Sequence, residues 1–359
     1  MNAQLLEAVE ESNTAEVQRV LELSRGLHIS ETLGFALCKA IENNSVEIAQ
    51  LLLKFRADVC SMSVDGWRPI HYAAKTGNLD IMKLIIQAGS SMSTFTADNA
   101  GKTAMHIAVK NGHVPIVQYL VDKGAMYSRS KCHVEGDTPL HVAVKLGSLE
   151  MCRILLSKIC HRDVKNLKEE TALHIAVKDN KYSIISCLLD AGANIEETDA
   201  LGKSALIIAA DDKSLKLMTV LLQRGANPNA QDKRKRTCMH YLAMSRPNDI
   251  RLEMAKLLVA AGMTEINTDD IDHYTPLHYA AYKGNVELIR LMIAVGVQVN
   301  KFYPWRRDTP LNMAISCRKI ETVKVLVEEG GVDVTQDDGK QSRQTALHKL
   351  MFFKCESKC

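Results

Sequence analysis

A four-residue phrase recurs along the chain at a nearly constant spacing. Its first residue is usually Thr, its second Pro or a small residue, its third Leu, Ile or Met, and its fourth usually His. The nine copies lie at 68–71, 103–106, 138–141, 171–174, 204–207, 237–240, 275–278, 309–312 and 345–348, in steps of 33 to 38 residues. A period of this length indicates a repeat architecture, in which one short supersecondary unit is stacked many times.

The residues around each phrase predict two helices per repeat. Thr caps the start of the first helix, and Pro fits its first position, where no backbone N–H is needed. A small residue follows two positions after the His, as in Ala143 and Ala280, and lets neighbouring helices approach closely. A second helix carries an apolar pair, and Gly at its end supplies a left-handed cap. Such glycines occur at 89, 124, 192, 225, 262, 296 and 330.

The period of about 33 residues and the Thr-Pro-Leu-His phrase resemble the ankyrin repeat. Two degenerate copies precede the nine, around Leu5 and Ala36. The resemblance implies an all-α ankyrin-repeat solenoid of helix-turn-helix pairs with projecting β-hairpin loops, about ten full repeats and a partial eleventh. We expect a single solenoid over 1–353: degenerate repeats at 1–64, regular repeats at 65–234, an irregular repeat at 235–271, repeats at 272–353 with the last incomplete, and a short tail at 354–359.

Two places depart from the pattern. In the irregular repeat Leu242 replaces the small residue, and the turn Ser245–Asp249 is four residues longer than in the third repeat. We therefore expect a hinge or a change of curvature near 240–252. The last repeat presents an apolar cluster at 347–353 without a second helix to cover it. This end frays, docks against a partner, or belongs to a longer protein.

Seven histidines occupy the fourth position of the phrase, and they do not indicate a metal site. Successive repeats lie roughly 10 Å apart at helix-packing distance, whereas zinc needs ligands at about 2.1 Å from one centre. The ankyrin resemblance implies instead that each imidazole bonds the backbone between repeats. The sequence contains no phosphate-binding glycine loop, nucleophile elbow or metalloprotease motif. We expect no enzyme activity, cofactor, metal or small-molecule substrate.

Aromatic and basic residues in the loops are the candidate protein-binding residues. Aromatic residues are only 5% of the chain, and a loop Trp or Tyr beside Arg is typical of an interface hot spot. The alternative is that these rings pack on neighbouring structure, and that the basic run at 233–236 pairs with acidic residues of adjacent loops. The candidates are Trp67, Phe95, Tyr127, Arg234, Lys235, Arg236, Tyr274, Tyr303, Trp305, Arg306 and Arg307.

These observations favour an adaptor or scaffold that binds partner proteins through its hairpin loops and concave first-helix surface. The alternatives are a regulatory arm of a larger enzyme or ion channel, and a nuclear regulatory protein that uses the basic run. A net charge of +3 favours neither nucleic acid nor membrane as a partner. No stretch approaches about 18 apolar residues, so we expect no membrane insertion. Ten scattered cysteines suggest reduced thiols and a cytoplasmic or nuclear location. Asn229 stands where the resemblance implies a site of asparagine hydroxylation.

Overall fold

The computed structural model describes residues 2–25, 29–63, 65–89, 98–124, 132, 135–158, 161–301 and 309–334. These residues form twenty α-helices and no strand, which confirms the all-α class. The projecting loops were expected to be β-hairpins. An isolated antiparallel bridge joins Thr198 and Ser204, and the described loop residues form no strand pair longer than this.

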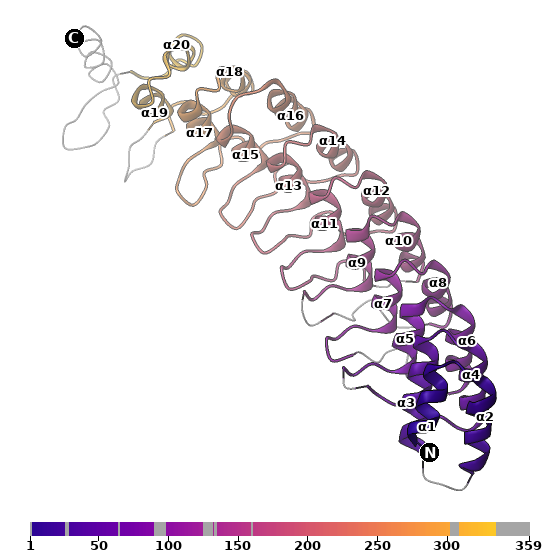
Figure 1. Ribbon diagram of the computed structural model, residues 1–359. Helices are drawn as coiled ribbons and strands as arrows, with labels where there is room; N and C mark the ends of the chain where they lie inside the picture. Colours follow the sequence, from indigo (N-terminus) through magenta and orange to yellow (C-terminus); the bar gives the residue numbers. More distant parts are fainter. Residues whose placement is uncertain are drawn as a thin grey trace. The chain divides into compact units, whose positions relative to one another are not determined.

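The chain divides into two compact units, Met1–Asn194 and Ile195–Cys359. In the first unit, odd-numbered helices pack against one another in an inner row and even-numbered helices form an outer row (Figure 1). Its helices are α1 (Asn2–Glu10), α2 (Thr14–Leu23), α3 (Ser30–Glu42), α4 (Val46–Lys54), α5 (Pro69–Thr76), α6 (Leu79–Gln87), α7 (Ala104–Lys110), α8 (Val114–Asp122), α9 (Pro139–Leu146), α10 (Leu149–Leu156), α11 (Ala172–Lys178) and α12 (Tyr182–Asp190).

The second unit repeats the same plan. Helices α13, α15, α17 and α19 form its inner row, and α14, α16, α18 and α20 form its outer row. Their bounds are α13 (Ala205–Asp211), α14 (Leu215–Gln223), α15 (Cys238–Met244), α16 (Asp249–Ala260), α17 (Pro276–Lys283), α18 (Val286–Ala294), α19 (Pro310–Ser316) and α20 (Ile320–Glu328).

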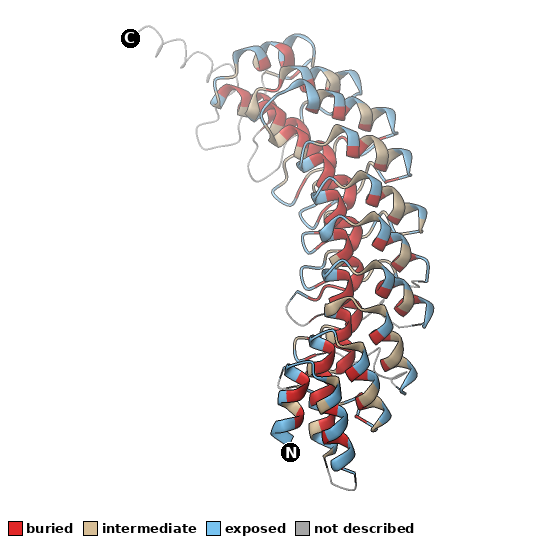
Figure 2. Cartoon of the chain, turned by 45° about the vertical axis from the view of Figure 1, so that its right-hand side comes forward, coloured by how far each residue is buried: buried red, intermediate tan, exposed pale blue. Residues whose placement is uncertain are grey.

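The buried residues of each unit are concentrated along the inner helices (Figure 2). Ala143 and Ala280, the small residues of the pattern, are completely buried, as expected where helices approach closely. The phrase residues are buried with them: Thr275 is 1% exposed and His278 is 2% exposed. The recurring residues are therefore a structural framework, and each repeat depends on its neighbours to bury them.

Glycine ends most of the outer helices as expected. Gly192 and Gly225 have φ values of 84° and 85°, in the left-handed region that disfavours other residues. The expectation for the last outer helix was wrong by one residue. Gly331, with φ 62°, takes the left-handed conformation after α20, whereas Gly330 does not, because Glu329, the residue that follows the helix, still has a right-handed helical conformation and the chain turns later.

The irregular repeat has a specific arrangement at its long turn. Leu242 is fully buried in α15, which ends at Met244, and α16 is twelve residues long where the other outer helices of this unit have nine. Arg251 is 2% exposed, and its Nη1 donates to the backbone oxygen of Tyr241 at 3.3 Å. A cation is favourable at this C-terminal end of α15 because the last carbonyls carry negative partial charge. The expected hinge at 240–252 remains a prediction.

A row of side chains connects the loops of successive repeats in the second unit. The Asn267 side-chain oxygen accepts from the backbone N–H of Gln298 at 2.7 Å, and Asn300 accepts from Asp333 at 3.0 Å. Asn229 accepts from the N–H groups of Thr264 and Glu265 at 3.0 and 3.1 Å. The side-chain oxygen of Asn229 is thus part of the loop framework, and its hydroxylation remains a hypothesis.

Candidate protein-interaction surface

The histidines of the phrase join successive repeats. His141 is buried, and its Nδ1 accepts from the backbone N–H of Thr138 at 3.1 Å. The proton therefore resides on Nε2, which donates to the backbone oxygen of Glu170 in the next loop at 3.0 Å. His106 and His240 make the same contact with Asp137 and Tyr274. This confirms the inter-repeat bond that the resemblance implied.

The predicted basic candidates Arg234 and Arg236 are largely engaged within the protein. Nε of Arg236 donates to the Asp270 carboxylate at 3.1 Å, and the two side chains are 13% and 0% exposed. The Tyr279 hydroxyl donates to the same carboxylate at 2.7 Å. Arg234 pairs with Asp272 at 2.6 Å, with both side chains about half exposed. The self-pairing considered from the sequence is therefore present for both arginines.

The Asp270 carboxylate is held in its charged form. Burial raises the pKa of this carboxyl, but the hydrogen bonds from Tyr279, the Tyr274 backbone and Arg236 outweigh burial and lower the pKa below its usual value. Burial together with the Asp270 carboxylate raises the pKa of the Tyr279 hydroxyl to about 12. This cluster consequently joins two loops and does not present a free charge. Lys235, at the loop tip, is exposed.

The two described aromatic candidates are half-buried. The ring of Trp67 packs edge-on against Tyr72 with centroids 5.2 Å apart, and the Lys75 ammonium lies 5.8 Å from its centroid. Tyr274 packs against Tyr279 at 5.7 Å. Both rings thus contact the first helix of their own repeat, and each keeps part of its surface in solvent. Phe95, Tyr127, Tyr303, Trp305, Arg306 and Arg307 lie outside the described residues, as does the cluster at 347–353.

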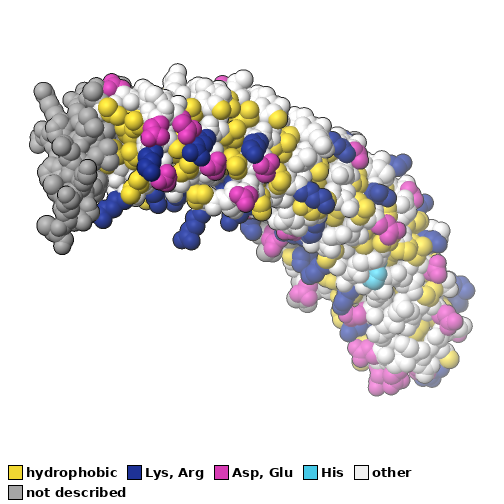
Figure 3. All heavy atoms as spheres, turned by 90° about the horizontal axis from the view of Figure 1, so that it is seen from above, with side chains coloured by type: hydrophobic (Ala, Val, Ile, Leu, Met, Phe, Trp, Pro, Cys, Tyr) yellow, Lys and Arg dark blue, Asp and Glu magenta, His cyan; other side chains and the backbone are white. Residues whose placement is uncertain are grey.

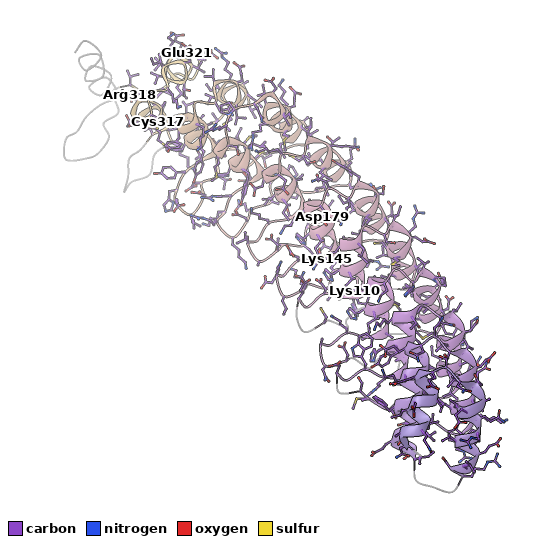
Figure 4. All side chains as sticks on the ribbon, in the orientation of Figure 1. Lys110, Lys145, Asp179, Cys317, Arg318 and Glu321 are labelled. Atoms are coloured by element: carbon purple, nitrogen blue, oxygen red, sulfur yellow. The ribbon has the colours of Figure 1, made fainter. Side chains whose placement is uncertain are left out.

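The ends of the inner helices form a second surface. Lys110 is the last residue of α7, Lys145 is the last but one residue of α9, and Asp179 directly follows α11 (Figure 4). These positions are exposed. The position of Lys110 and Lys145 is also Lys in the repeats on either side, whereas the position of Asp179 is Asn111, Leu146 and Asp212 in other repeats. Lys145 contacts the carboxylates of Glu135 and Asp137, and Lys178 donates to Glu170 at 2.7 Å. Lys145 and Lys178 are thus neutralised by acidic loop residues of their own repeat.

A groove lies at the corresponding helix ends of the second unit. It has a volume of about 750 Å³, within the usual range of about 300–1,000 Å³ for ligand sites. None of its residues was among the sequence-based candidates, although the long turn after α15, which was noted, supplies one wall. The lining residues are Arg246, Pro247, Tyr282, Lys283, Cys317 and Lys319.

Charges elsewhere on the second unit are mixed. In Figure 3, on the part next to the grey C-terminal residues, Lys and Arg side chains are interspersed with Asp, Glu and apolar side chains. This distribution differs from the single-sign basic stripe of a nucleic-acid interface. Among the described residues, no group of three His, Cys, Asp or Glu side chains is placed to hold a metal ion. No helix in the described ranges is long and apolar enough to cross a membrane.

The family model for ankyrin repeats in three copies matches residues 5–96, 93–166, 158–232, 206–303 and 239–338. The chain belongs to the ankyrin-repeat family. Its structure is similar to the ankyrin repeat domain of Bcl-3, a member of the IkappaB protein family, with a TM-score of 0.56 and 28% identity. That match covers 64% of this chain and 99% of the Bcl-3 domain.

Ankyrin-repeat relatives match shorter stretches of the chain. Alpha-latrotoxin-Lt1a of Latrodectus tredecimguttatus is 33% identical over 29% of this chain, and Alpha-latrotoxin-Lg1a of Latrodectus geometricus is 34% identical over the same share. The match spans only 7% of each toxin. The Notch-regulated ankyrin repeat-containing protein of Xenopus tropicalis is 34% identical over 22% of this chain and 75% of its own length. Ankyrin repeats are in general protein-interaction modules, and these matches carry that general property to this chain.

Proposed function

We propose that this protein is an adaptor or scaffold that binds partner proteins through its loops and the exposed ends of its inner helices. The observation that carries the proposal is that the buried positions of the repeats are constant and an exposed position at the inner-helix ends is variable. The recurring Thr, His and Ala residues are buried, whereas the exposed position five residues after the fourth phrase residue changes and is Asn111, Leu146, Asp179 and Asp212 in successive repeats. Such a surface can change its partner without changing the framework.

The charged loops support the same function. Arg234 and Arg236 are positioned by Asp272 and Asp270, so the neighbouring Lys235 extends from a preorganised loop. Preorganisation favours binding because fewer side chains must be ordered when a partner docks. A cytoplasmic or nuclear location agrees with this proposal, because the buried thiols of Cys38, Cys152 and Cys238 are unpaired.

A regulatory arm of a larger enzyme or channel is the second candidate function. The similarity to the alpha-latrotoxins favours it, because the matching segment makes up only 7% of each toxin's length. One more similar protein is the serine/threonine-protein kinase VIK of Arabidopsis thaliana, whose matching segment is 17% of its length. Sequencing of the full transcript distinguishes the adaptor from the regulatory arm. A catalytic or pore-forming segment encoded in the same reading frame would favour the regulatory arm.

The test of partner binding is affinity capture from a cell lysate with the full chain as bait. A loop variant, Lys235→Ala with Trp305→Ala, serves as the comparison, and Lys324→Ala on the outer helix α20 is the control. We expect proteins captured by the wild type and the control to be reduced with the loop variant. A folded full chain that captures no protein above background would refute the proposal.

A further inference from the structure

The groove between the inner-helix ends of the second unit differs in charge from the corresponding places in the first unit. Three of its six lining residues are cationic, namely Arg246, Lys283 and Lys319, and none is acidic. Within the described ranges these three side chains form no ion pair with a carboxylate. Three adjacent unneutralised cations repel one another, and an anionic ligand would relieve that repulsion.

The chain contains its own comparison for this site. Lys181, at the start of α12, occupies the same position of its repeat as Lys319 does before α20. Nζ of Lys181 donates to the backbone oxygens of Val144 and Lys145 at 2.8 and 2.9 Å, and pairs with Asp179 at 2.6 Å. Cys317 stands where Asp179 would be (Figure 4). Lys319 therefore lacks the carboxylate that neutralises its counterpart.

Neighbouring groups contact two of these three cations. The aliphatic part of Lys319 covers Gly284, where an added Cβ would lie 2.8 Å from Lys319 Cδ. The Lys283 ammonium lies 5.2 Å from the centroid of the Tyr282 ring. Arg246 and Pro247 come from the long turn after α15, which the other repeats lack. The extra turn residues thus build one wall of the groove and supply one of its charges.

Apolar surface accompanies the positive charge. Tyr282 is 47% exposed and Ile320, which directly follows Lys319, is 69% exposed. An exposed aromatic ring beside Arg and Lys suits a peptide that offers carboxylates together with an apolar side chain. On the face that Figure 3 shows, Lys and Arg side chains are interspersed with Asp and Glu side chains, so a continuous phosphate backbone that extended across it would meet acidic side chains.

We propose that the groove between α15, α17 and α19 binds an acidic peptide segment of a partner protein, with its carboxylates on Arg246, Lys283 and Lys319 and an apolar side chain against Tyr282. This inference rests on the proposed protein-binding function and assigns one surface and one partner chemistry to it.

The test uses the full chain and a short synthetic peptide of Asp and Glu residues with one central Leu. Binding is measured by titration at low salt, and the rate of Cys317 alkylation reports whether the peptide occupies the groove. Cys60, an exposed thiol of the first unit, is the internal reference. We expect the peptide to slow alkylation of Cys317 and not of Cys60. A peptide with Asn and Gln in place of the acids should have no such effect.

The double variant Arg246→Ala with Lys283→Ala should bind the acidic peptide about tenfold more weakly, since two rim charge pairs are lost. The control, Lys256→Ala with Lys324→Ala, makes the same change of charge on outer helices of the same unit and should bind as the wild type does. Far-ultraviolet circular dichroism checks that both variants are folded. Unchanged binding by the groove variant, or no protection of Cys317, would overturn the proposal.

Two further outcomes separate the possible errors. If an RNA oligonucleotide protects Cys317 better than the acidic peptide does, the groove binds nucleic acid and the proposed class of ligand is wrong. If the peptide does not bind while the chain still captures proteins from a lysate, the groove inference fails and the adaptor function stands. If neither the peptide nor any protein binds, both fail.

Discussion

Substitution of Asp270 by Ala should destabilise the second unit more than substitution of any exposed acid around it. The Asp270 carboxylate accepts four hydrogen bonds, from the Tyr279 hydroxyl, Arg236 Nε and the backbone N–H groups of Asp272 and Tyr274. Its removal leaves a nearly buried guanidinium without its main counter-charge. Breaking a buried pair in this way costs about 3–5 kcal/mol.

The structure places the expected loss at the lower end of that range. Arg236 Nη2 lies 3.4 Å from the Tyr279 oxygen and 3.7 Å from the Asp272 carboxylate, so it keeps two weaker partners. We expect a decrease of about 3 kcal/mol in the free energy of unfolding, measured by urea titration. Asp272→Ala, which breaks a half-exposed pair with Arg234, should cost no more than about 1 kcal/mol.

The pH dependence provides a second check of the same reasoning. Because the pKa of Asp270 is lowered in the folded state, its contribution is present above about pH 4 and is lost as the pH falls through the folded-state pKa. The difference between wild type and Asp270→Ala should therefore shrink in acid. An Asp270→Ala variant as stable as Asp272→Ala, or a difference independent of pH, would refute the account of this cluster.

Three other perturbations have defined outcomes. Burial lowers the pKa of His240 to about 4, so the unfolded state binds a proton at this residue first as the pH falls below about 6.5. The wild type should therefore lose about 3 kcal/mol of its free energy of unfolding by pH 4. This loss should be absent when His240→Asn is titrated with acid in the same way. Asn229→Ala removes two loop hydrogen bonds and should cost about 1–2 kcal/mol in urea unfolding; no change would mean that the loop row is not stabilising. Burial raises the pKa of the Cys238 thiol to about 12, so an alkylating reagent should modify Cys60 first and Cys238 only on unfolding; equal rates by mass spectrometry would contradict the burial.

The sequence alone determined the framework of this protein. The phrase recurs at a fixed period, and each of its residues has one local role: Thr138 caps a helix, Pro139 starts it, and Ala143 permits close packing. Local roles of this kind depend on residues near in sequence, which is why the repeat and its helices could be predicted. The bond of His141 to the next loop was expected from the resemblance to the ankyrin repeat and not from its neighbours in sequence.

The position of left-handed glycine at the last outer helix could not be fixed in the same way. Gly330 and Gly331 are adjacent, and either could end a helix on propensity alone. Which of the two takes the left-handed conformation depends on where α20 ends and on how the buried Val332 packs after it, and neither follows from the local sequence.

The surface chemistry was decided by tertiary structure. The sequence showed a basic run at 233–236, but only the stacking of two loops brings Arg236 onto Asp270, thirty-four residues away in the chain. The groove was not predicted at all, because Arg246, Lys283 and Lys319 come from three repeats. A periodic sequence specifies its core by local pattern, whereas a binding surface depends on which exposed side chains the stacking places side by side.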